Sequence, residues 1–442
     1  MGTTSIHHVL EMHPSRRDVL RATGAITAGS FLAPTAAARP ESGSVPGFHR
    51  EPSAEGSWPQ QRYSGAHTGY HPTATGPKTG LEERWRFDVR PRVGPVVDDD
   101  SVYLVGESSD PDEHHDVLYA LEAADGGVRW AVDLEERTNA LALDARRLYA
   151  GGDSLRAYSR ADGTVEWTFP IETGGPSEDG GLALAGRRLY VTDEETVYGV
   201  NTVSGVVVWR RPLGGRLTPP AVCGNCVYVG RVAGDRGLDR TVFALGARTG
   251  RVRWEHDLVP PSASEANLVG PPVVANGRVY LRTTAGGEED IFRTPIYGLV
   301  SLDRATGGDE RPITRTYAGF DLHPIAAGGG RIYTTAVDFT SVSGIAVRDA
   351  DGTGGWTIHG DDGDVHVSTA PTVAGGVLYV GSDSSRFGIL TDGLYAIDAA
   401  TGAVLSTLDL AVIAAPVVVD GTVYARSEQA LHAIGEPAAG EA

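Results

Sequence analysis

The residues best suited to chemistry are two cysteines, Cys223 and Cys226, which form a Cys-x-x-Cys pair. Such a pair suggests either a metal site or a redox-active dithiol. A zinc site would need two further soft ligands, and the sequence contains no second cysteine pair. The pair aligns with residues 275–278 (ANGR), where two residues form a turn between strands. We therefore expect the cysteines to face each other across a hairpin, where they would either form a local disulfide or stay reduced.

Two further groups of polar side chains could bind a cation. In the stretch Glu113-His114-His115-Asp116 the imidazoles and carboxylates could hold a divalent metal, with His114, His115 and Asp116 as its ligands. The acidic run at 361–364, between His359 and His366, could hold Ca²⁺ through oxygen ligands. In so acidic a chain both groups could equally be solvated loops. The sequence has no Gly-x-Ser-x-Gly, phosphate-binding loop or His-Glu-x-x-His motif.

The composition restricts the classes of partner. The formal net charge is -19, and Lys78 is the only lysine, so nearly all the positive charge is arginine. This acidic, lysine-poor composition resembles that of proteins from salt-loving archaea. In 1 M salt the Debye length is about 3 Å, so the net charge would then say little about partners. A nucleic-acid ligand is not expected, because no basic patch offsets the acidic total.

The elements that must position these residues come from a repeat. Residues 242–254 read VFALGARTGRVRW, and close variants occur at 118–130, 197–209 and, in part, 394–402. Both alternating faces of the first strand in this stretch are apolar, which indicates a strand buried between two neighbouring sheets. The glycine that follows Thr, Ser or Asp suits a hairpin turn. A tryptophan usually follows four residues later and would fill the space between sheets; the structural tryptophans are Trp85, Trp130, Trp167, Trp209, Trp254 and Trp356.

The two ends of the repeat array predict a closed ring. Eight apolar-aromatic strands with a central tyrosine follow one another at 102–105, 148–150, 189–191, 227–229, 279–281, 332–334, 378–380 and 423–425. The last unit stops at Ile434 without a fourth strand, whereas residues 83–87 (ERWRF) look like an orphan fourth strand. Joining the two completes an eighth sheet. The sequence therefore predicts an all-β, eight-bladed β-propeller of four-stranded antiparallel blades, closed by an N-terminal strand.

In a propeller the first strand of each blade lines the central channel. These strands open with recurring prolines and varied polar residues. The channel-lining candidates are Asn139, Thr218, His323 and Thr369, which could contact a ligand or could be satisfied polar groups in the wall. They do not form a set that suggests a reaction.

The repeat resembles that of the pyrroloquinoline-quinone (PQQ) propellers, over residues 81–435. That group includes quinoprotein dehydrogenases and the BamB-like propellers of outer-membrane protein assembly, so the resemblance specifies the fold better than the function. For a dehydrogenase it implies PQQ and Ca²⁺ in the channel, a catalytic aspartate, two adjacent cysteines and a tryptophan beneath the quinone. The sequence has no adjacent cysteines, and Trp58 is the only tryptophan outside the repeat. PQQ or Ca²⁺ remains a possible cofactor, but neither is predicted firmly.

The N-terminus predicts export. Arg16 and Arg17 precede an apolar run that ends before Ala36-Ala37-Ala38, as in a twin-arginine signal with its cleavage site. We therefore expect a signal peptide at 1–38, an extended lead-in at 39–80, the propeller at 81–435 and a disordered tail at 436–442. The lead-in could pack on the propeller or be a tether. The mature protein would be extracellular or at the cell surface, without a membrane anchor.

The function that we predict is that of a non-enzymatic binding propeller, which binds another protein through its loops and central channel. Two alternatives stay open. One is a PQQ-dependent, dehydrogenase-like oxidoreductase, and the other is a propeller that binds a small molecule or glycan without turnover.

Overall fold

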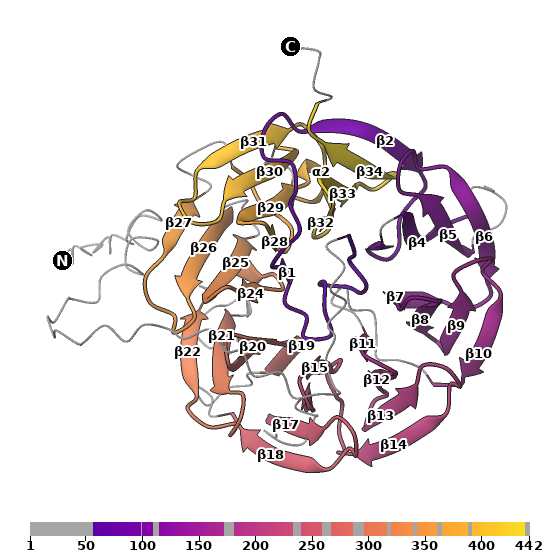
Figure 1. Ribbon diagram of the computed structural model, residues 1–442. Helices are drawn as coiled ribbons and strands as arrows, with labels where there is room; N and C mark the ends of the chain where they lie inside the picture. Colours follow the sequence, from indigo (N-terminus) through magenta and orange to yellow (C-terminus); the bar gives the residue numbers. More distant parts are fainter. Residues whose placement is uncertain are drawn as a thin grey trace, which may run out of the picture. The chain divides into compact units, whose positions relative to one another are not determined.

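The computed structural model describes residues 56–98, 100–108, 115–171, 181–232, 240–258, 267–285, 296–315, 320–338, 343–359, 365–387 and 391–437. Within these ranges the strands form eight antiparallel sheets arranged as the blades of a ring (Figure 1). The predicted eight-bladed β-propeller is confirmed. The described part also contains one helical turn, α2 (Ser384–Phe387), and no helix there is long and apolar enough to cross a membrane.

In each blade the strands follow one another from the channel outward. Blade 1 contains β3 (Val96–Val97), β4 (Ser101–Glu107), β5 (Asp116–Glu122) and β6 (Val128–Leu134). Blade 2 contains β7 (Thr138–Leu143), β8 (Arg147–Gly152), β9 (Leu155–Ser159) and β10 (Val165–Phe169). Blade 3 contains β11 (Leu182–Ala185), β12 (Arg188–Thr192), β13 (Thr196–Asn201) and β14 (Val207–Pro212). Blade 4 contains β15 (Ala221–Cys223), β16 (Cys226–Gly230), β17 (Thr241–Gly246) and β18 (Val252–Asp257).

The second half of the ring repeats this order. Blade 5 contains β19 (Asn267–Ala275), β20 (Arg278–Ala285), β21 (Ile296–Asp303) and β22 (Arg311–Arg315). Blade 6 contains β23 (Phe320–Leu322), β24 (Ala326–Gly328), β25 (Arg331–Asp338), β26 (Ser343–Asp349) and β27 (Trp356–His359). Blade 7 contains β28 (Thr372–Ala374), β29 (Val377–Ser382), β30 (Gly393–Asp398) and β31 (Val404–Leu408), and β1 (Tyr70–His71) joins it at the inner edge. Blade 8 contains β32 (Val417–Val419), β33 (Thr422–Arg426), β34 (Ala430–Gly435) and β2 (Glu82–Asp88).

Blade 8 closes the ring with strands from both ends of the propeller. β2 pairs antiparallel with β34, from Glu82 opposite Gly435 to Asp88 opposite Ala430, and the two strands lie side by side in Figure 1. This is the closure that the orphan fourth strand predicts. It leaves no open sheet between the first and last blades, so the ring has only short strand edges.

The repeated tryptophans join neighbouring blades by the same contact. Each indole Nε1–H donates to a backbone carbonyl in the turn of the following blade, at 2.9–3.2 Å, and the ring lies against the glycine of that turn. The six pairs are Trp85 with Ala123, Trp130 with Arg160, Trp167 with Thr202, Trp209 with Ala247, Trp254 with Arg304, and Trp356 with Ala399. The turn glycine therefore has two functions: it adopts a positive φ, and it leaves room for the indole.

Two blades lack the tryptophan and use smaller contacts. In blade 7 the Ser406 hydroxyl accepts the Leu81 backbone N–H at 3.2 Å. In blade 5 Ile313 lies against Gly352 of the next turn. The rest of each interface is apolar, since the strands of the middle of each blade are buried on both faces, as the repeat predicts.

Candidate functional site

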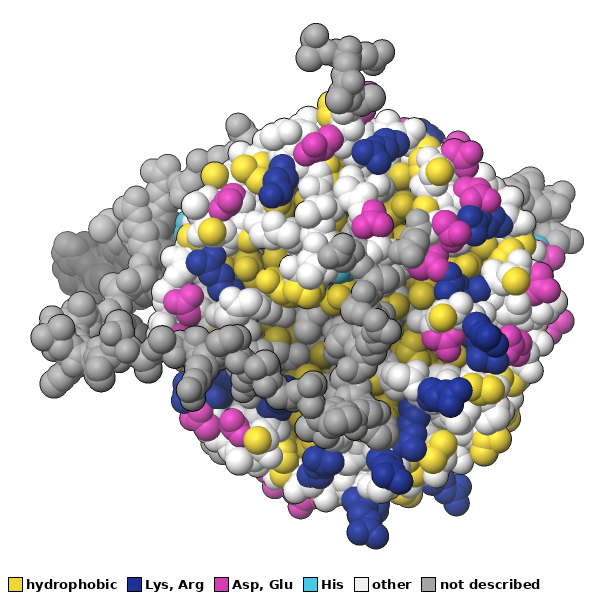
Figure 2. Space-filling model, viewed as in Figure 1, with side chains coloured by type: hydrophobic (Ala, Val, Ile, Leu, Met, Phe, Trp, Pro, Cys, Tyr) yellow, Lys and Arg dark blue, Asp and Glu magenta, His cyan; other side chains and the backbone are white. Residues whose placement is uncertain are grey.

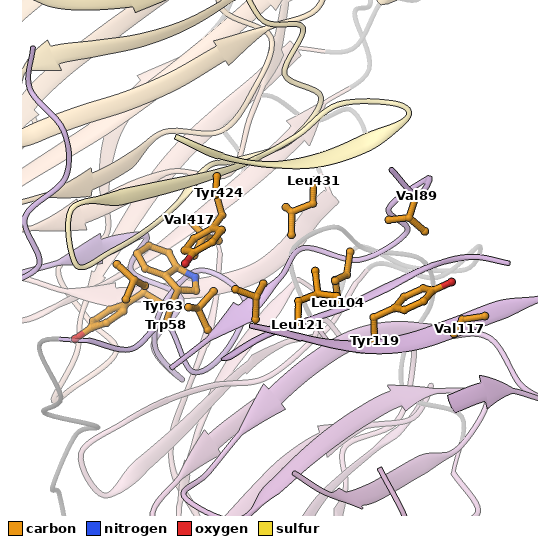
Figure 3. Close-up of a cluster of buried hydrophobic side chains, with 14 residues drawn as sticks. Trp58, Tyr63, Val89, Leu104, Val117, Tyr119, Leu121, Val417, Tyr424 and Leu431 are labelled. Atoms are coloured by element: carbon orange, nitrogen blue, oxygen red, sulfur yellow. The ribbon is translucent and has the colours of Figure 1, made fainter. Parts of the chain in front are cut away.

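The lead-in segment enters the ring and closes one end of its channel. We call residues 56–75 the plug; in Figure 1 it is the indigo chain that winds inside the ring to β1. Trp58 is 1% exposed and packs in a buried cluster with Val97 of blade 1 and with Val417 and Tyr424 of blade 8 (Figure 3). From Gly56 onward the lead-in is therefore docked on the propeller, which settles the alternative of a free tether for this part of it.

The plug bonds to the inner edge of every blade in turn. In each blade one N–H group, on the first strand or in the turn after it, donates to a plug oxygen at 2.6–2.9 Å. The pairs, from blade 1 to blade 8, are Val97 with Trp58, Leu143 with Pro59, Leu184 with the Gln60 side chain, Val222 with Gly65, Val274 with Ala66, Ala327 with Thr68, Val373 with Gly69, and Gly421 with Thr75. A strand edge that faced an open channel would leave these donors without a protein partner. The plug thus satisfies the inner edges and ties all eight blades together.

Arg62 fixes the plug across blades 6 and 7. Its guanidinium donates to the backbone carbonyls of Ile325, at 2.6 Å, and of Pro371, at 3.0 Å. The plug backbone takes a positive φ at Arg62, Tyr63 and His67. Side chains rarely adopt this conformation unless their surroundings hold them there. The plug therefore has a defined conformation that its contacts with the blades hold in place.

Above the plug the channel is an open cup of about 1070 Å³. Trp58, Gln61 and Arg62 of the plug line it, together with the residues that begin the inner strands. Its wall includes Arg282 of β20 and Arg426 of β33. In the view of Figure 2 basic and acidic side chains are interspersed around the ring. Within the described residues the plug therefore lines one end of this cavity.

The charges of the cup differ between its buried part and its rim. The buried ionic side chains that line it are arginines: Arg62, Arg282 and Arg426 are 7%, 9% and 8% exposed. The carboxylates that line it, Asp193, Glu194 and Glu195, come from the single turn between β12 and β13, and the two glutamates are exposed. A ligand carboxylate that reached the buried part would therefore meet guanidinium groups, which bind carboxylates strongly.

One buried acceptor of the cup has no protein partner. Gln61 is 8% exposed, and its Oε1 accepts no hydrogen bond within the described residues. An unsatisfied buried carbonyl costs free energy, on the order of 1–3 kcal/mol. A ligand that carried a donor N–H or O–H group next to its carboxylate would remove this cost.

The structure places three of the four channel-lining candidates in the cup. Thr218, His323 and Thr369 line it, while Asn139 lines a neighbouring cavity of about 620 Å³. Thr218 and Thr369 have the same local role in blades 4 and 7, since each hydroxyl accepts a backbone N–H at 2.9 Å, from Gly230 and Gly381 respectively. The His323 backbone N–H donates to Thr335. Thr218 and Thr369 therefore support the backbone of the wall.

The sequence analysis missed the arginines, although a signal was present. In six blades the residue after the Tyr-x pair of the second strand is Val, Gly or Thr, whereas Arg282 and Arg426 occupy this place in blades 5 and 8. An arginine at a buried repeat position that elsewhere holds a small uncharged residue suggests a specific function.

Two of the predicted metal ligands, His115 and Asp116, line the second cavity. His115 Nε2 is 3.2 Å from Asp133 Oδ1, and Asp116 Oδ1 is 3.5 Å from Arg92 Nε. Burial raises the pKa of the Asp116 carboxyl, with Arg92 acting in the opposite direction. His114 and the acidic run at 361–364 lie outside the described residues. Within the described ranges no three His, Cys, Asp or Glu side chains are grouped as a metal site, and the metal hypothesis stays a prediction.

The donor set of the cup fits a PQQ cofactor only in part. The arginines would suit the carboxylates of the quinone. A quinone also needs a flat ring to stack on and oxygen ligands for its Ca²⁺. The indole of Trp58 packs against Tyr63, with ring centroids 5.2 Å apart, and near His71, at 6.3 Å. The cup thus offers guanidinium groups that would suit the carboxylates of a quinone, and its own carboxylates come from the one turn Asp193–Glu195; we derive no redox step from these residues.

Comparison with known proteins places this geometry in a family. The sequence matches the family of outer membrane protein assembly factor BamB over residues 73–178, 151–316, 232–358 and 338–435. The chain belongs to this family of PQQ-type repeat propellers. No curated protein sequence matches the chain.

Solved structures of both functional groups share the fold. A europium-containing methanol dehydrogenase is 15% identical with a TM-score of 0.59, over 86% of this chain and 90% of its own. A quinohemoprotein alcohol dehydrogenase from Pseudomonas putida is 14% identical with a TM-score of 0.60, over 88% and 82%. BamB from Moraxella catarrhalis is 15% identical with a TM-score of 0.55, over 82% and 99%. At these identities the likeness shows the fold alone.

Proposed function

We propose that this protein is a non-enzymatic binding propeller that takes an acidic segment of a partner protein into the plugged channel. The observation that carries the proposal is the cup itself: a cavity of about 1070 Å³ whose buried ionic lining, within the described residues, consists of Arg62, Arg282 and Arg426. Cavities of several hundred Å³ are large enough to hold ligands. A short acidic segment could enter through the mouth, while the plugged face is closed by protein.

The structure suggests how such a segment would bind. Its carboxylates would accept hydrogen bonds from the guanidinium groups, and its backbone N–H groups could donate to Gln61 Oε1. Because the guanidinium groups are buried, salt should weaken these contacts less than it weakens surface ion pairs. The exposed part of the lining carries Glu194 and Glu195 together with Arg216, so the rim has both signs of charge.

We propose further that the protein works outside the cytoplasmic membrane. The paired arginines Arg16 and Arg17 ahead of an apolar run support this. Replacing both arginines by lysines should keep the protein in the cytoplasm of its host. Secretion of the variant at the normal rate would contradict export by the twin-arginine route.

Selection from a random peptide library tests the binding function. Peptides with Asp or Glu should be enriched on the protein, and the enrichment should disappear on the variant in which Arg282 and Arg426 are both replaced by glutamine. The matched control replaces Arg86 and Arg129, which lie on exposed strands outside the cup. Enrichment without an acidic preference, or an acidic preference that survives the double change, would contradict the proposal.

The quinoprotein alternative is tested separately. The refolded protein is incubated in high salt with PQQ and Ca²⁺, and absorbance and alcohol-dependent reduction of a dye are recorded. Stoichiometric uptake of the quinone with turnover would establish an oxidoreductase and refute the non-enzymatic function.

A further inference from the structure

The two cysteines lie opposite each other at the end of the first hairpin of blade 4. Cys223 ends β15 and Cys226 begins β16, and the two are register partners across a two-residue turn whose Gly224 has φ +61°. Directly opposed residues on antiparallel strands project to the same face, with Cα atoms about 4.5–5.5 Å apart. A disulfide requires a Cα separation of about 4.4–6.8 Å. The Cα separation expected for such a pair therefore lies within the range that a disulfide requires.

An arginine of the next blade faces Cys223. Arg304, in the turn after β21, donates from Nη1 to Cys223 Sγ at 3.3 Å. The backbone carbonyl of Arg304 is held in place by two hydrogen bonds. It accepts one from the Trp254 indole N–H at 3.1 Å and one from the Tyr228 hydroxyl at 3.4 Å. Both cysteines are partly buried and face the apolar interface between blades 4 and 5. Arg304 is therefore anchored where its guanidinium reaches the sulfur.

The propeller contains a second copy of this arrangement, with a carboxylate in place of the thiol. Arg160 of blade 2 has the position of Arg304, because its backbone carbonyl accepts the indole N–H of Trp130 from the preceding blade. Its guanidinium forms an ion pair with Asp98, which directly follows β3 of that blade. Cys223 has the corresponding place in blade 4. Asp98 and Cys223 each come directly after a residue, Val97 or Val222, whose backbone N–H donates to the plug. Cys223 thus stands where the repeat elsewhere holds an anion.

We propose that Cys223 and Cys226 form a redox-active dithiol, in which Arg304 favours the thiolate of Cys223 and Cys226 closes the disulfide. A guanidinium next to a thiol favours its charged form, which is the nucleophile in thiol–disulfide exchange. This site is independent of the cup and of the proposed binding function.

The reaction takes its oxidant from a low-molecular-weight disulfide, RSSR. The Cys223 thiolate attacks one sulfur of RSSR, which forms a mixed disulfide and releases RS⁻. Cys226 then loses its proton and attacks the sulfur of Cys223, which forms the Cys223–Cys226 bond and releases a second RS⁻. Both RS⁻ take up a proton, so the protein loses two electrons and two protons while RSSR becomes two RSH. In the oxidised form Cys223 no longer carries a charge that Arg304 can neutralise.

The groups that surround the thiol set the expected pH dependence. Burial, followed by the charge of Cys226, raises the pKa of Tyr228, so this hydroxyl stays neutral and does not compete for Arg304 at neutral pH. The positive charge next to Cys223 is then that of Arg304.

The first experiment uses the folded protein in buffers of reduced and oxidised glutathione, with the disulfide measured by mass spectrometry after alkylation. We expect an intramolecular disulfide in the wild type, and a stable mixed disulfide between glutathione and Cys223 in Cys226→Ser. The converse variant, Cys223→Ser, should form its mixed disulfide at least tenfold more slowly. If no ratio of the two glutathiones produced the intramolecular bond, or if both single variants reacted at equal rates, the proposal would be overturned.

The second experiment tests Arg304 by the pH dependence of alkylation of Cys223 in Cys226→Ser. Arg304→Gln should raise the pH midpoint of alkylation by about one unit, and Arg304→Lys should restore most of it. The matched control is Arg160→Gln, which removes the equivalent arginine of blade 2 and should leave the midpoint unchanged. Thermal unfolding identifies variants that fail to fold. Equal midpoints in folded Arg304→Gln and Arg160→Gln proteins would overturn the assigned role of Arg304.

Discussion

Replacement of Trp58 by alanine should destabilise the whole propeller, although the residue lies outside every blade. Its side chain is 1% exposed and packs against Val97, Val417 and Tyr424, so it joins blade 1 to blade 8 at the point where the ring closes (Figure 3). Removing a buried tryptophan in this way costs about 3–5 kcal/mol of the free energy of unfolding. The two backbone hydrogen bonds between Trp58 and Val97 can remain, which limits the loss to the side chain.

This loss can be expressed as a melting temperature. The entropy of unfolding near 60 °C is about 2 cal/mol/K per residue. For a chain of this size, a loss of 3–5 kcal/mol in the free energy of unfolding therefore corresponds to a decrease in Tm of about 4–6 °C. The assay is thermal unfolding followed by circular dichroism, with Val206→Ala as the control. Val206 is 61% exposed on the outer edge of blade 3, so its truncation should change the free energy by less than about 0.5 kcal/mol. Equal Tm values for Trp58→Ala and Val206→Ala would refute the structural role of the plug.

Three further predictions concern single contacts. Gly126→Ala should lower the Tm of the protein more than Gly277→Ala does. Both glycines have a positive φ, but only at Gly126 would the new Cβ lie 2.7 Å from the Trp85 ring. Equal decreases in Tm would contradict this. Trp254→Phe should lower the free energy of unfolding in urea by about 1 kcal/mol, because the hydrogen bond to the following blade is removed. An unchanged urea midpoint would count against that bond. Burial lowers the pKa of His71 to about 4, so the unfolded chain binds the proton at a higher pH than the folded protein does. The free energy of unfolding should therefore decline as the pH falls from 6.5 to 4. His71→Asn should show a smaller decline, and an identical pH profile would exclude His71 as the cause.

The repeat predicted the fold because its pattern is local and is present in every blade. The Thr-Gly turn, the aromatic second strand and the tryptophan four residues after the glycine each make one kind of contact, and the structure repeats that contact around the ring. The closing strand could be predicted because one blade lacked a fourth strand and the N-terminus had a spare one. The pairing of β2 with β34 confirms that inference.

The candidate site was harder to predict because its contacts are not local. The plug has no strand period, and its hydrogen bonds join residues 58–75 to blades spread over more than three hundred positions of the chain. Nothing in a single repeat indicates that Arg62 reaches the carbonyls of Ile325 and Pro371. The buried arginines could have been found, since Arg282 and Arg426 stand where the other six blades have a small uncharged residue. Their meeting with Arg62 in one cavity depends on the radius of the closed ring and on the path of the plug.

Isothermal titration calorimetry shows whether the plugged channel is the binding site. An acidic peptide obtained from library selection is titrated into the wild type, into the Arg282→Gln, Arg426→Gln protein and into the matched surface variant at Arg86 and Arg129. We expect one site per chain, with affinity reduced at least tenfold by the two changes in the cup and unchanged by the two on the surface. Equal affinity for all three proteins would show that the peptide binds elsewhere and would contradict the account.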